Sequence, residues 1–337
     1  MEQSTAAPAT QQDLDRCFDE IARLTAENLE RRDPQKERRI LELRHLAGVA
    51  LGPQSNGATG YPEPALDALP DGDLPEVTPD QLTPELLRAA IVARGALLVR
   101  GLLDPSEAER LAGEIEQAFQ AHEAHKEGGS PEAGYYEEFN PESGFQLGSR
   151  AWVNTASGLW GTDSPRVMFS MLEAMDRAGL QRLATGYLGE RPAISVEKCT
   201  LRRVNPDFLP GNNYSAWHQD GAFLGDVRAL NVWLTLSRCG DVAPGLDVVP
   251  RRLDYIAETG TEGTAFRWSV SQAVAEECAG DVGIKRPIFE PGDVMLFDEL
   301  FLHSTAADPG MTQTRYAIET WFFGPSAFPS EYTPLAF

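Results

Sequence analysis

Short apolar segments alternate with Gly, Pro and Asp turns throughout the stretch after Pro192, and this pattern constrains the fold more than any other feature of the chain. The segments are rich in Val, Leu, Trp and Phe and cover residues 194–204, 216–219, 230–236, 246–249, 287–289, 294–297 and 316–323. Several short strands separated by turn residues predict a β-sandwich or a barrel. The sequence Pro291-Gly292-Asp293 is a clear turn signal between two of them. We therefore expect a mainly β core in this half of the chain.

The first half of the chain predicts helices. Apolar residues recur at helical spacing from residue 12 to about 50, and Pro34 is expected to divide this stretch into two helices. Residues 52–83 contain many Gly, Pro and Asp residues, which indicates a linker or a long arm. We therefore separate an N-terminal helical extension with its linker, residues 1–82, from a main domain, residues 83–337. The extension could form a homodimer contact or a lid, or it could be a poorly ordered tail.

The main domain is expected to begin with a helix that starts at Pro84 and that Gly95 ends. A short strand at 96–99 and a second helix from 105 to about 122 follow. A further helix is expected over residues 165–187.

Composition excludes several classes of partner. The formal net charge of −22 argues against nucleic acid and anionic membrane surfaces as partners. No apolar run approaches the ~20 residues that span a bilayer, and the N-terminus does not read as a secretory signal. The four cysteines are widely spaced and form no CxxC pair, which argues against a thiolate zinc site and a disulfide framework. We expect a cytoplasmic protein.

His218 and Asp220 form the first part of a candidate metal site. In a strand, residues i and i+2 point to the same face, so the imidazole and the carboxylate can converge on one ion. The pair alone is a pattern that arises often by chance. His303 lies at the end of the apolar run 294–297 and the turn that follows it, and this strand could neighbour the one that carries His218. Two histidines and one carboxylate match the facial triad of non-haem Fe(II) oxygenases, although zinc is compatible with the same ligands.

Arg315 lies twelve residues after His303, on the next expected strand. Its fixed fork of donors suits a carboxylate, as anchoring the distal end of 2-oxoglutarate would require. Considered alone, Arg315 would be interpreted as an ordinary surface or salt-bridged arginine. His122 and His125 also share a helix end with two glutamates, but we interpret them as a solvated helix end and not as a metal site.

Five segments in order resemble the phytanoyl-CoA dioxygenase family of Fe(II)/2-oxoglutarate oxygenases. They are HQD, NVWLTL, VAPGLDVVP, PGDVMLFDELFLHST and TRYAIETWFF. The upstream stretch GALLVRGLLDPSEAERLAGEIE resembles the opening strand and helix of that family. The resemblance covers residues 85–325 and leaves the first 80 residues uncovered. One departure is Pro250-Arg251-Arg252-Leu253, where the family often has Gly-Ser-His after the proline.

The resemblance implies a double-stranded β-helix, a jelly-roll or cupin-like core, with flanking helices. His218, Asp220 and His303 match the metal ligands of the family, and Arg315 matches its 2-oxoglutarate anchor. Three further residues match positions near the co-substrate, and they are Thr305, Trp233 and Ser215. Related halogenases lack the carboxylate, so the presence of Asp220 favours hydroxylation or another oxidation over halogenation.

These observations predict an Fe(II)- and 2-oxoglutarate-dependent dioxygenase. It would use O2 to hydroxylate or otherwise oxidise a small molecule, with release of succinate and CO2, and the substrate would be a specialised metabolite. One alternative is a cupin-like metal enzyme that does not use 2-oxoglutarate. Another is a non-catalytic partner subunit of an oxygenase.

The residues that contact the substrate are harder to predict. We hypothesise substrate contacts for five residues, Trp152, Asn154, Trp217, Phe223 and Phe301, because they precede the barrel or flank the metal ligands in sequence. Plain core packing is the alternative for each aromatic residue. Residues 123–147, rich in Gly, Glu and Tyr, could form a lid that closes over the substrate.

Overall fold

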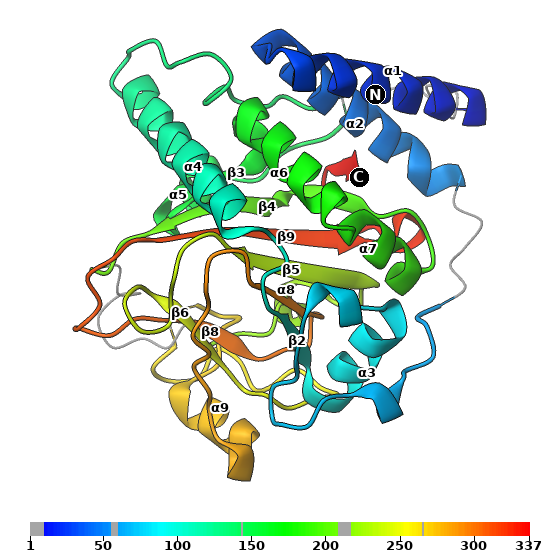
Figure 1. Cartoon of the computed structure of the whole chain (residues 1–337). Helices are drawn as coiled ribbons and strands as arrows, with labels where there is room; N and C mark the ends of the chain where they lie inside the picture. The colour runs from blue at the N-terminus through cyan, green and yellow to red at the C-terminus, as the bar shows by residue number, and fades with distance from the viewer. Residues whose placement is uncertain (1–9, 55–59, 143, 208–216, 265) are drawn as a thin grey trace, which may run out of the picture.

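A large mixed sheet runs through the centre of the computed structural model, which describes residues 10–54, 60–142, 144–207, 217–264 and 266–337 (Figure 1). Within these residues the sheet has eight strands. Seven follow one another in the order β1 (Glu76–Val77), β2 (Ala96–Val99), β7 (Val294–Phe297), β5 (Ala229–Thr235), β9 (Arg315–Phe323), β4 (Ala193–Val204) and β10 (Pro334–Ala336). The eighth, β3 (Gly158–Trp160), pairs with β4.

A second, smaller sheet faces the first. It contains β6 (Gly245–Val248) and β8 (His303–Ala306), which are antiparallel. Single bridges widen it, because His218 pairs with His303 and Val248 pairs with Lys285. The chain passes from β5 in the large sheet to β6 in the small one, and again from β7 to β8. This alternation between two facing sheets is the jelly-roll arrangement of a double-stranded β-helix, so the expected fold class is confirmed.

Helices cover the outer face of the large sheet. Nine α-helices occur in the described part of the chain: α1 (Gln11–Glu30), α2 (Pro34–Gln54), α3 (Pro84–Arg94), α4 (Pro105–Lys126), α5 (Arg150–Thr155), α6 (Pro165–Arg177), α7 (Leu180–Leu188), α8 (Gly221–Leu224) and α9 (Gln272–Ala279). Short 3-10 helices occur at Leu66–Ala68, Pro79–Gln81, Gly161–Asp163, Gly280–Val282 and Pro325–Ala327. Figure 1 shows α1, α2, α4 and α6 on one side of the sheet and β6, β8 and α9 on the other.

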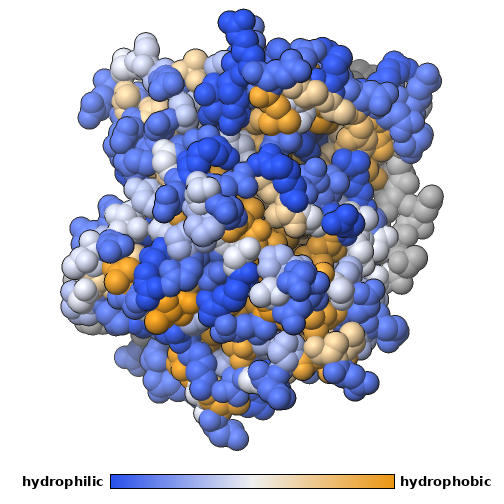
Figure 2. Space-filling view, viewed as in Figure 1, coloured by the Kyte–Doolittle hydropathy of each residue, from blue (hydrophilic) through white to orange (hydrophobic). Residues whose placement is uncertain are grey.

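Two of the apolar cores formed by the described residues follow this layering. One lies between the helices and the outer face of the sheet, and it includes Met171, Leu201 and Phe322. The other lies between the two sheets and includes Trp233 and Phe297. None of the helices formed by the described residues is both long and apolar enough to cross a membrane. The face in Figure 2 is mostly hydrophilic with scattered apolar residues, in keeping with the high net charge.

Most expected elements are present, and three differ. The strand expected over 287–289 is a single bridge at Phe289, and the one expected over 216–219 shows only the bridges of Trp217 and His218 among its described residues. Pro34 starts a second helix, Thr83 caps α3, and Gly95 ends α3 with a left-handed backbone (φ 88°). The single helix expected over 165–187 is two helices, α6 and α7. They separate at Gly179, whose φ of 82° no right-handed helix contains.

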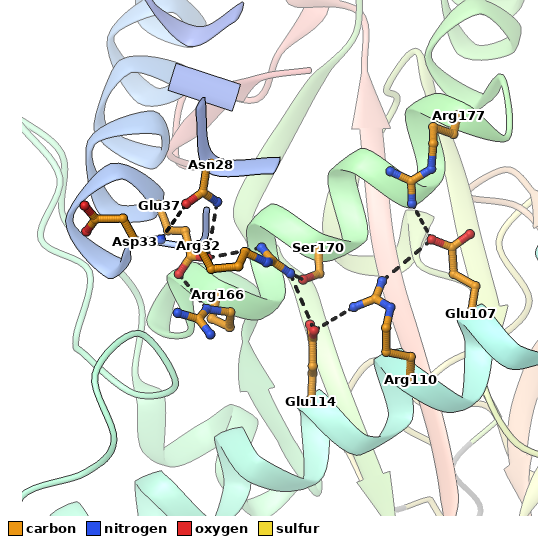
Figure 3. A network of polar contacts seen from close by, with 10 residues as sticks. All are labelled: Asn28, Arg32, Asp33, Glu37, Glu107, Arg110, Glu114, Arg166, Ser170 and Arg177. Carbon is orange, nitrogen blue, oxygen red and sulfur yellow. Dashed lines mark hydrogen bonds and ion pairs between the residues drawn. The ribbon is translucent and has the colours of Figure 1, made fainter. Parts of the chain in front are cut away.

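The N-terminal helices pack against the rest of the chain. α2 contacts α6 and β10, and α1 lies on α2. The buried Glu37 carboxylate accepts hydrogen bonds from Arg32 Nη1 at 3.1 Å and from Arg166 Nε of α6 at 2.8 Å. Figure 3 shows how this network continues through Arg32 to Glu114 of α4. Residues 10–54 are therefore packed helices, while the boundary proposed at residue 82 remains a prediction.

Candidate metal centre

His218, Asp220 and His303 come together beside the small sheet. Their ligand atoms lie within 4.8 Å of one another, and they form a group that could hold a metal ion. His218 Nε2 is 3.9 Å from Asp220 Oδ1, and the two imidazole centroids are 4.4 Å apart. The His218 side chain is 21% exposed, so solvent can reach it.

The backbone places the two histidines next to each other. His218 N donates to His303 O at 2.9 Å, and His303 N donates to His218 O at 3.0 Å. This reciprocal pair confirms that the two segments are neighbours. His303 begins a strand of its own, β8, which we had expected to be a turn. Strand pairing thus sets the two rings side by side.

Asp220 reaches the group by a different geometry from the one expected. Its backbone is helical (φ −63°, ψ −25°), and it precedes α8, so the alternation of side chains along a strand does not apply to it. The buried Gln219 fixes this turn, because its Nε2 donates to Leu300 O at 2.7 Å and its Oε1 accepts from Ala257 N at 2.7 Å. Gln219 is a positioning residue that sequence reasoning missed.

The unsatisfied groups of the triad fit a cation. His303 Nδ1 lies 3.0 Å from Phe301 O, which makes it the donor and leaves Nε2 with its lone pair. Asp220 Oδ2 is buried without a hydrogen-bond partner among the described residues. Burial raises the pKa of Asp220 to about 6, and the nearby His303 opposes this. A buried carboxylate oxygen beside two imidazoles is a donor set suited to a divalent metal.

Arg315 lies at the start of β9 and is buried. Its Nη1 donates to Gly245 O at 2.9 Å, and its guanidinium carbon lies 5.5 Å from the centre of the Trp233 ring. Among the described residues, its Nε has no hydrogen-bond partner and no carboxylate lies within ion-pair distance of the guanidinium. Burial lowers the pKa of Arg315 to about 10, so the group remains cationic near neutral pH. It is therefore not the salt-bridged arginine that we considered as the alternative.

Thr305 and Trp233 surround this region from two strands. Thr305 is partly buried and lies two residues after His303 on β8, so both project from the same face of that strand. Trp233 is buried in β5 and contacts the Phe289 ring at 4.8 Å. Ser215 lies outside the described residues.

Three charged residues between the sheets were missed from the sequence. Lys198 and Arg202 come from β4 and Glu319 from β9. Arg202 Nη2 pairs with Glu319 Oε2 at 2.7 Å. Burial raises the pKa of Glu319, but Arg202 and the imidazoles of the triad outweigh this and bring it to about 2. Glu319 lies four residues after Arg315 in the same strand, so alternation alone could have placed both on one face.

The five expected substrate residues lie in different environments. Phe223 and Trp152 lie near the triad or at the surface beside it: the Phe223 ring is 6.5 Å from His218, and Trp152 is 50% exposed. Trp217 is buried and its Nε1 donates to Gln272, while Phe301 is buried against Phe297. Asn154 Nδ2 approaches His122 Nε2 at 3.4 Å.

Part of the expected lid is packed into the core. Tyr135, Tyr136 and Phe139 are buried, and Phe139 N donates to Asp163 Oδ1 at 2.8 Å. His122 is also buried, against the Tyr136 ring at 4.7 Å, so the solvated helix end that we expected is wrong for this residue. His125 and the two neighbouring glutamates are exposed, as expected.

Comparison with known proteins gives likenesses at the level of folds. No protein-family model matches the chain, and no curated protein matches it. EctD from S. alaskensis, solved with 2-oxoglutarate and 5-hydroxyectoine, is 18% identical with a TM-score of 0.49, and the match covers 82% of this chain and 89% of EctD. SnoK, a non-heme alpha ketoglutarate dependent carbocyclase from nogalamycin biosynthesis, is 16% identical with a TM-score of 0.46, over 73% of this chain and 86% of SnoK.

A third solved structure is EvdO2 from Micromonospora carbonacea var. aurantiaca, complexed with 2-oxoglutarate. It is 15% identical with a TM-score of 0.42, over 74% of this chain and 91% of EvdO2. These three proteins bind or depend on the co-substrate that the sequence resemblance implies. At such identities and TM-scores these likenesses concern the fold and not the reaction of this chain.

Proposed function

We propose that this chain is an Fe(II)- and 2-oxoglutarate-dependent dioxygenase that hydroxylates, or otherwise oxidises, a small molecule. One observation carries the proposal: a two-histidine, one-carboxylate triad shares the interior of the barrel with a buried arginine that has no acidic partner among the described residues. Arg315 packs on Trp233, and Trp233 belongs to the same core as Phe297, whose ring is 4.9 Å from His303.

His218, Asp220 and His303 would hold the iron. When bound, the iron supplies activation of O2 coupled to the oxidation of 2-oxoglutarate to succinate and CO2. The protein contributes position and exclusion of water. The Phe301 carbonyl fixes the His303 tautomer, the pairing of β8 with the His218 segment fixes the imidazoles, and Gln219 fixes the turn before Asp220.

Arg315 would bind the distal carboxylate of 2-oxoglutarate. A buried guanidinium binds a carboxylate through two parallel hydrogen bonds, and its attraction is strong because water does not screen it there. Trp233 would line the co-substrate, with Thr305 and Ser215 as further contacts. A cupin-like enzyme that does not use 2-oxoglutarate would need no buried cation for a carboxylate, and this separates the proposal from that alternative.

The domain that does the chemistry is proposed to be residues 83–337. Residues 1–82 would serve as a structural extension. In the proposed homodimer, the two subunits contact each other through that extension. The α2 face that meets α6 and β10 is already covered, so a second subunit would meet α1. Leu29 at the end of α1 is 57% exposed and is a candidate for that contact.

Anaerobic calorimetry tests the metal and the co-substrate separately. The wild-type protein should bind one Fe(II) and then 2-oxoglutarate, and it should release succinate in air when a substrate is supplied. His218→Ala should lose Fe(II), whereas His125→Ala, which removes an exposed histidine of α4, should keep it. Stoichiometric iron in His218→Ala would refute the triad. Iron binding without any 2-oxoglutarate binding would favour the cupin-like alternative.

A further inference from the structure

Lys198 places an amine beside the triad without a polar partner. It is partly buried on β4, and its Nζ lies 4.0 Å from the centre of the Phe223 ring and 5.3 Å from that of Tyr332. Among the described residues Lys198 forms no hydrogen bond and no ion pair, and its Nζ lies over two aromatic rings. Cation–π contacts replace only part of the hydration that a partly buried ammonium gives up.

The acids near Lys198 are committed elsewhere. Of the charged groups, Asp220 and Glu319 attract the Lys198 ammonium most strongly. Glu319, however, is paired with Arg202 through two hydrogen bonds at 2.7 and 3.0 Å. Asp220 is a ligand of the proposed metal, whose positive charge then exceeds that of the carboxylate. If 2-oxoglutarate neutralises the excess charge of the metal and Arg315, Lys198 remains as an uncompensated cation.

A continuous row of aromatic rings leads from Lys198 to the surface. The Phe223 ring is 5.4 Å from Trp268, Trp268 stacks on Phe266 at 4.7 Å, and Phe266 meets Trp152 at 5.2 Å. Trp268 is also 5.3 Å from the His218 ring. Trp152 and Phe266 are 50% and 39% exposed. Exposed aromatic rings that continue directly to a metal ligand are typical of a recognition surface.

We propose that the substrate is a flat aromatic carboxylic acid, whose carboxylate pairs with Lys198 and whose ring system stacks along Phe223, Trp268 and Phe266. The proposal rests on the proposed function for the metal and 2-oxoglutarate. A neutral substrate would leave Lys198 unpaired. A carbohydrate would need hydrogen-bonding side chains along the row, but the row consists of phenylalanine and tryptophan rings.

Two probes of the same shape isolate the charge. 2-Naphthoate and the neutral 2-naphthamide are titrated anaerobically into the protein loaded with Fe(II) and 2-oxoglutarate. The naphthoate should bind at least about 10-fold more tightly, as one charge-assisted hydrogen bond permits. Lys198→Met should remove this preference and Lys198→Arg should restore part of it. Lys36→Met on α2, a lysine that pairs with Glu27, should leave it intact.

The aromatic row is tested with the same probes. Trp152→Ala should weaken both naphthalenes about 5-fold, because an aromatic contact is lost whatever the charge of the probe. Leu66→Ala, a similarly exposed apolar side chain on the 3-10 helix Leu66–Ala68, should have no effect. Equal affinity of the wild-type protein for naphthoate and naphthamide, or no binding of either, would overturn the proposal.

A final measurement separates this proposal from the proposed function. Lys198→Met should bind 2-oxoglutarate within about 2-fold of wild type. A loss as large as that of Arg315→Gln would assign Lys198 to the co-substrate and overturn the inference. If the wild-type protein binds no 2-oxoglutarate, the proposed function fails. Lys198 is then still tested by comparing the two probes in an Arg315→Gln background, where the other candidate carboxylate anchor is absent.

Discussion

Glu37 joins the N-terminal extension to the main domain, and its replacement by glutamine should destabilise the whole chain. The side chain is fully buried between α1, α2 and α6. It accepts from Arg32 Nη1 at 3.1 Å, from Arg166 Nε at 2.8 Å and from Asn28 Nδ2 at 3.3 Å (Figure 3). Glutamine keeps the shape but removes the charge that holds both arginines.

The magnitude follows from the two ionic hydrogen bonds. Each is worth about 1.5–3 kcal/mol net. The Arg32 and Arg166 side chains are 33% and 17% exposed, so water recovers part of this, and the glutamine oxygen still accepts one bond. We expect the free energy of unfolding to fall by about 3 kcal/mol. With an unfolding entropy of about 2 cal/mol/K per residue over 337 residues, the melting temperature should fall by about 4 °C.

Thermal denaturation and hydrogen exchange check this expectation together. Amide hydrogen exchange should become faster first in α1 and α2, because Glu37 holds these helices against α6. Glu20→Gln is the matched control, since Glu20 forms an exposed pair with Arg39 on the same two helices and should change the melting temperature by less than about 1 °C. A Glu37→Gln protein that melts like this control would refute the reasoning.

Three further changes test other parts of the structure. Arg315→Lys keeps the charge but loses the two parallel donors of the guanidinium, so calorimetry should show 2-oxoglutarate binding weakened at least about 30-fold with Fe(II) affinity unchanged. A change below about 3-fold would contradict the assigned role. Gly292→Ala should lower the free energy of unfolding in urea by about 2–4 kcal/mol, since the backbone has φ +95° and a Cβ would lie 2.2 Å from Leu103 O; an unchanged midpoint would show that the turn relaxes freely. Burial, and then the Asp298 charge, raise the pKa of Glu299, so the folded state holds this proton more tightly than the unfolded state and stability falls as pH rises from about 5 to 8. Glu299→Gln should flatten that part of the urea stability profile, and an unchanged slope would show that Glu299 does not titrate there.

The long strands and the triad could be predicted because their signals are local. Alternating apolar residues and turn residues give β4, β5, β7 and β9 to within about a residue, in line with the strength of the hydrophobic period as a signal. The spacing of His218 and Asp220 suggested a shared ion, although the structure achieves it through a turn and not through a strand.

The remaining features depend on distant parts of the chain. The strands β1 and β10 are two and three residues long, and their pairing with β2 and β4 gives no periodic signal. The break at Gly179 needs a left-handed residue, which a sequence that otherwise favours helix does not show. Phe266 and Trp268 lie outside any helix or strand, so only the folded chain brings them beside His218.

The reciprocal hydrogen bonds between His218 and His303 join two segments that are 85 residues apart in sequence. An ion held by both imidazoles would act as a cross-link across that loop, and it would bind the folded chain but not the unfolded one. Such a cross-link stabilises by mass action, and its contribution grows with the concentration of free metal. The concentration of free iron would then determine the lifetime of the folded protein as well as its activity, so a cell short of iron would lose both.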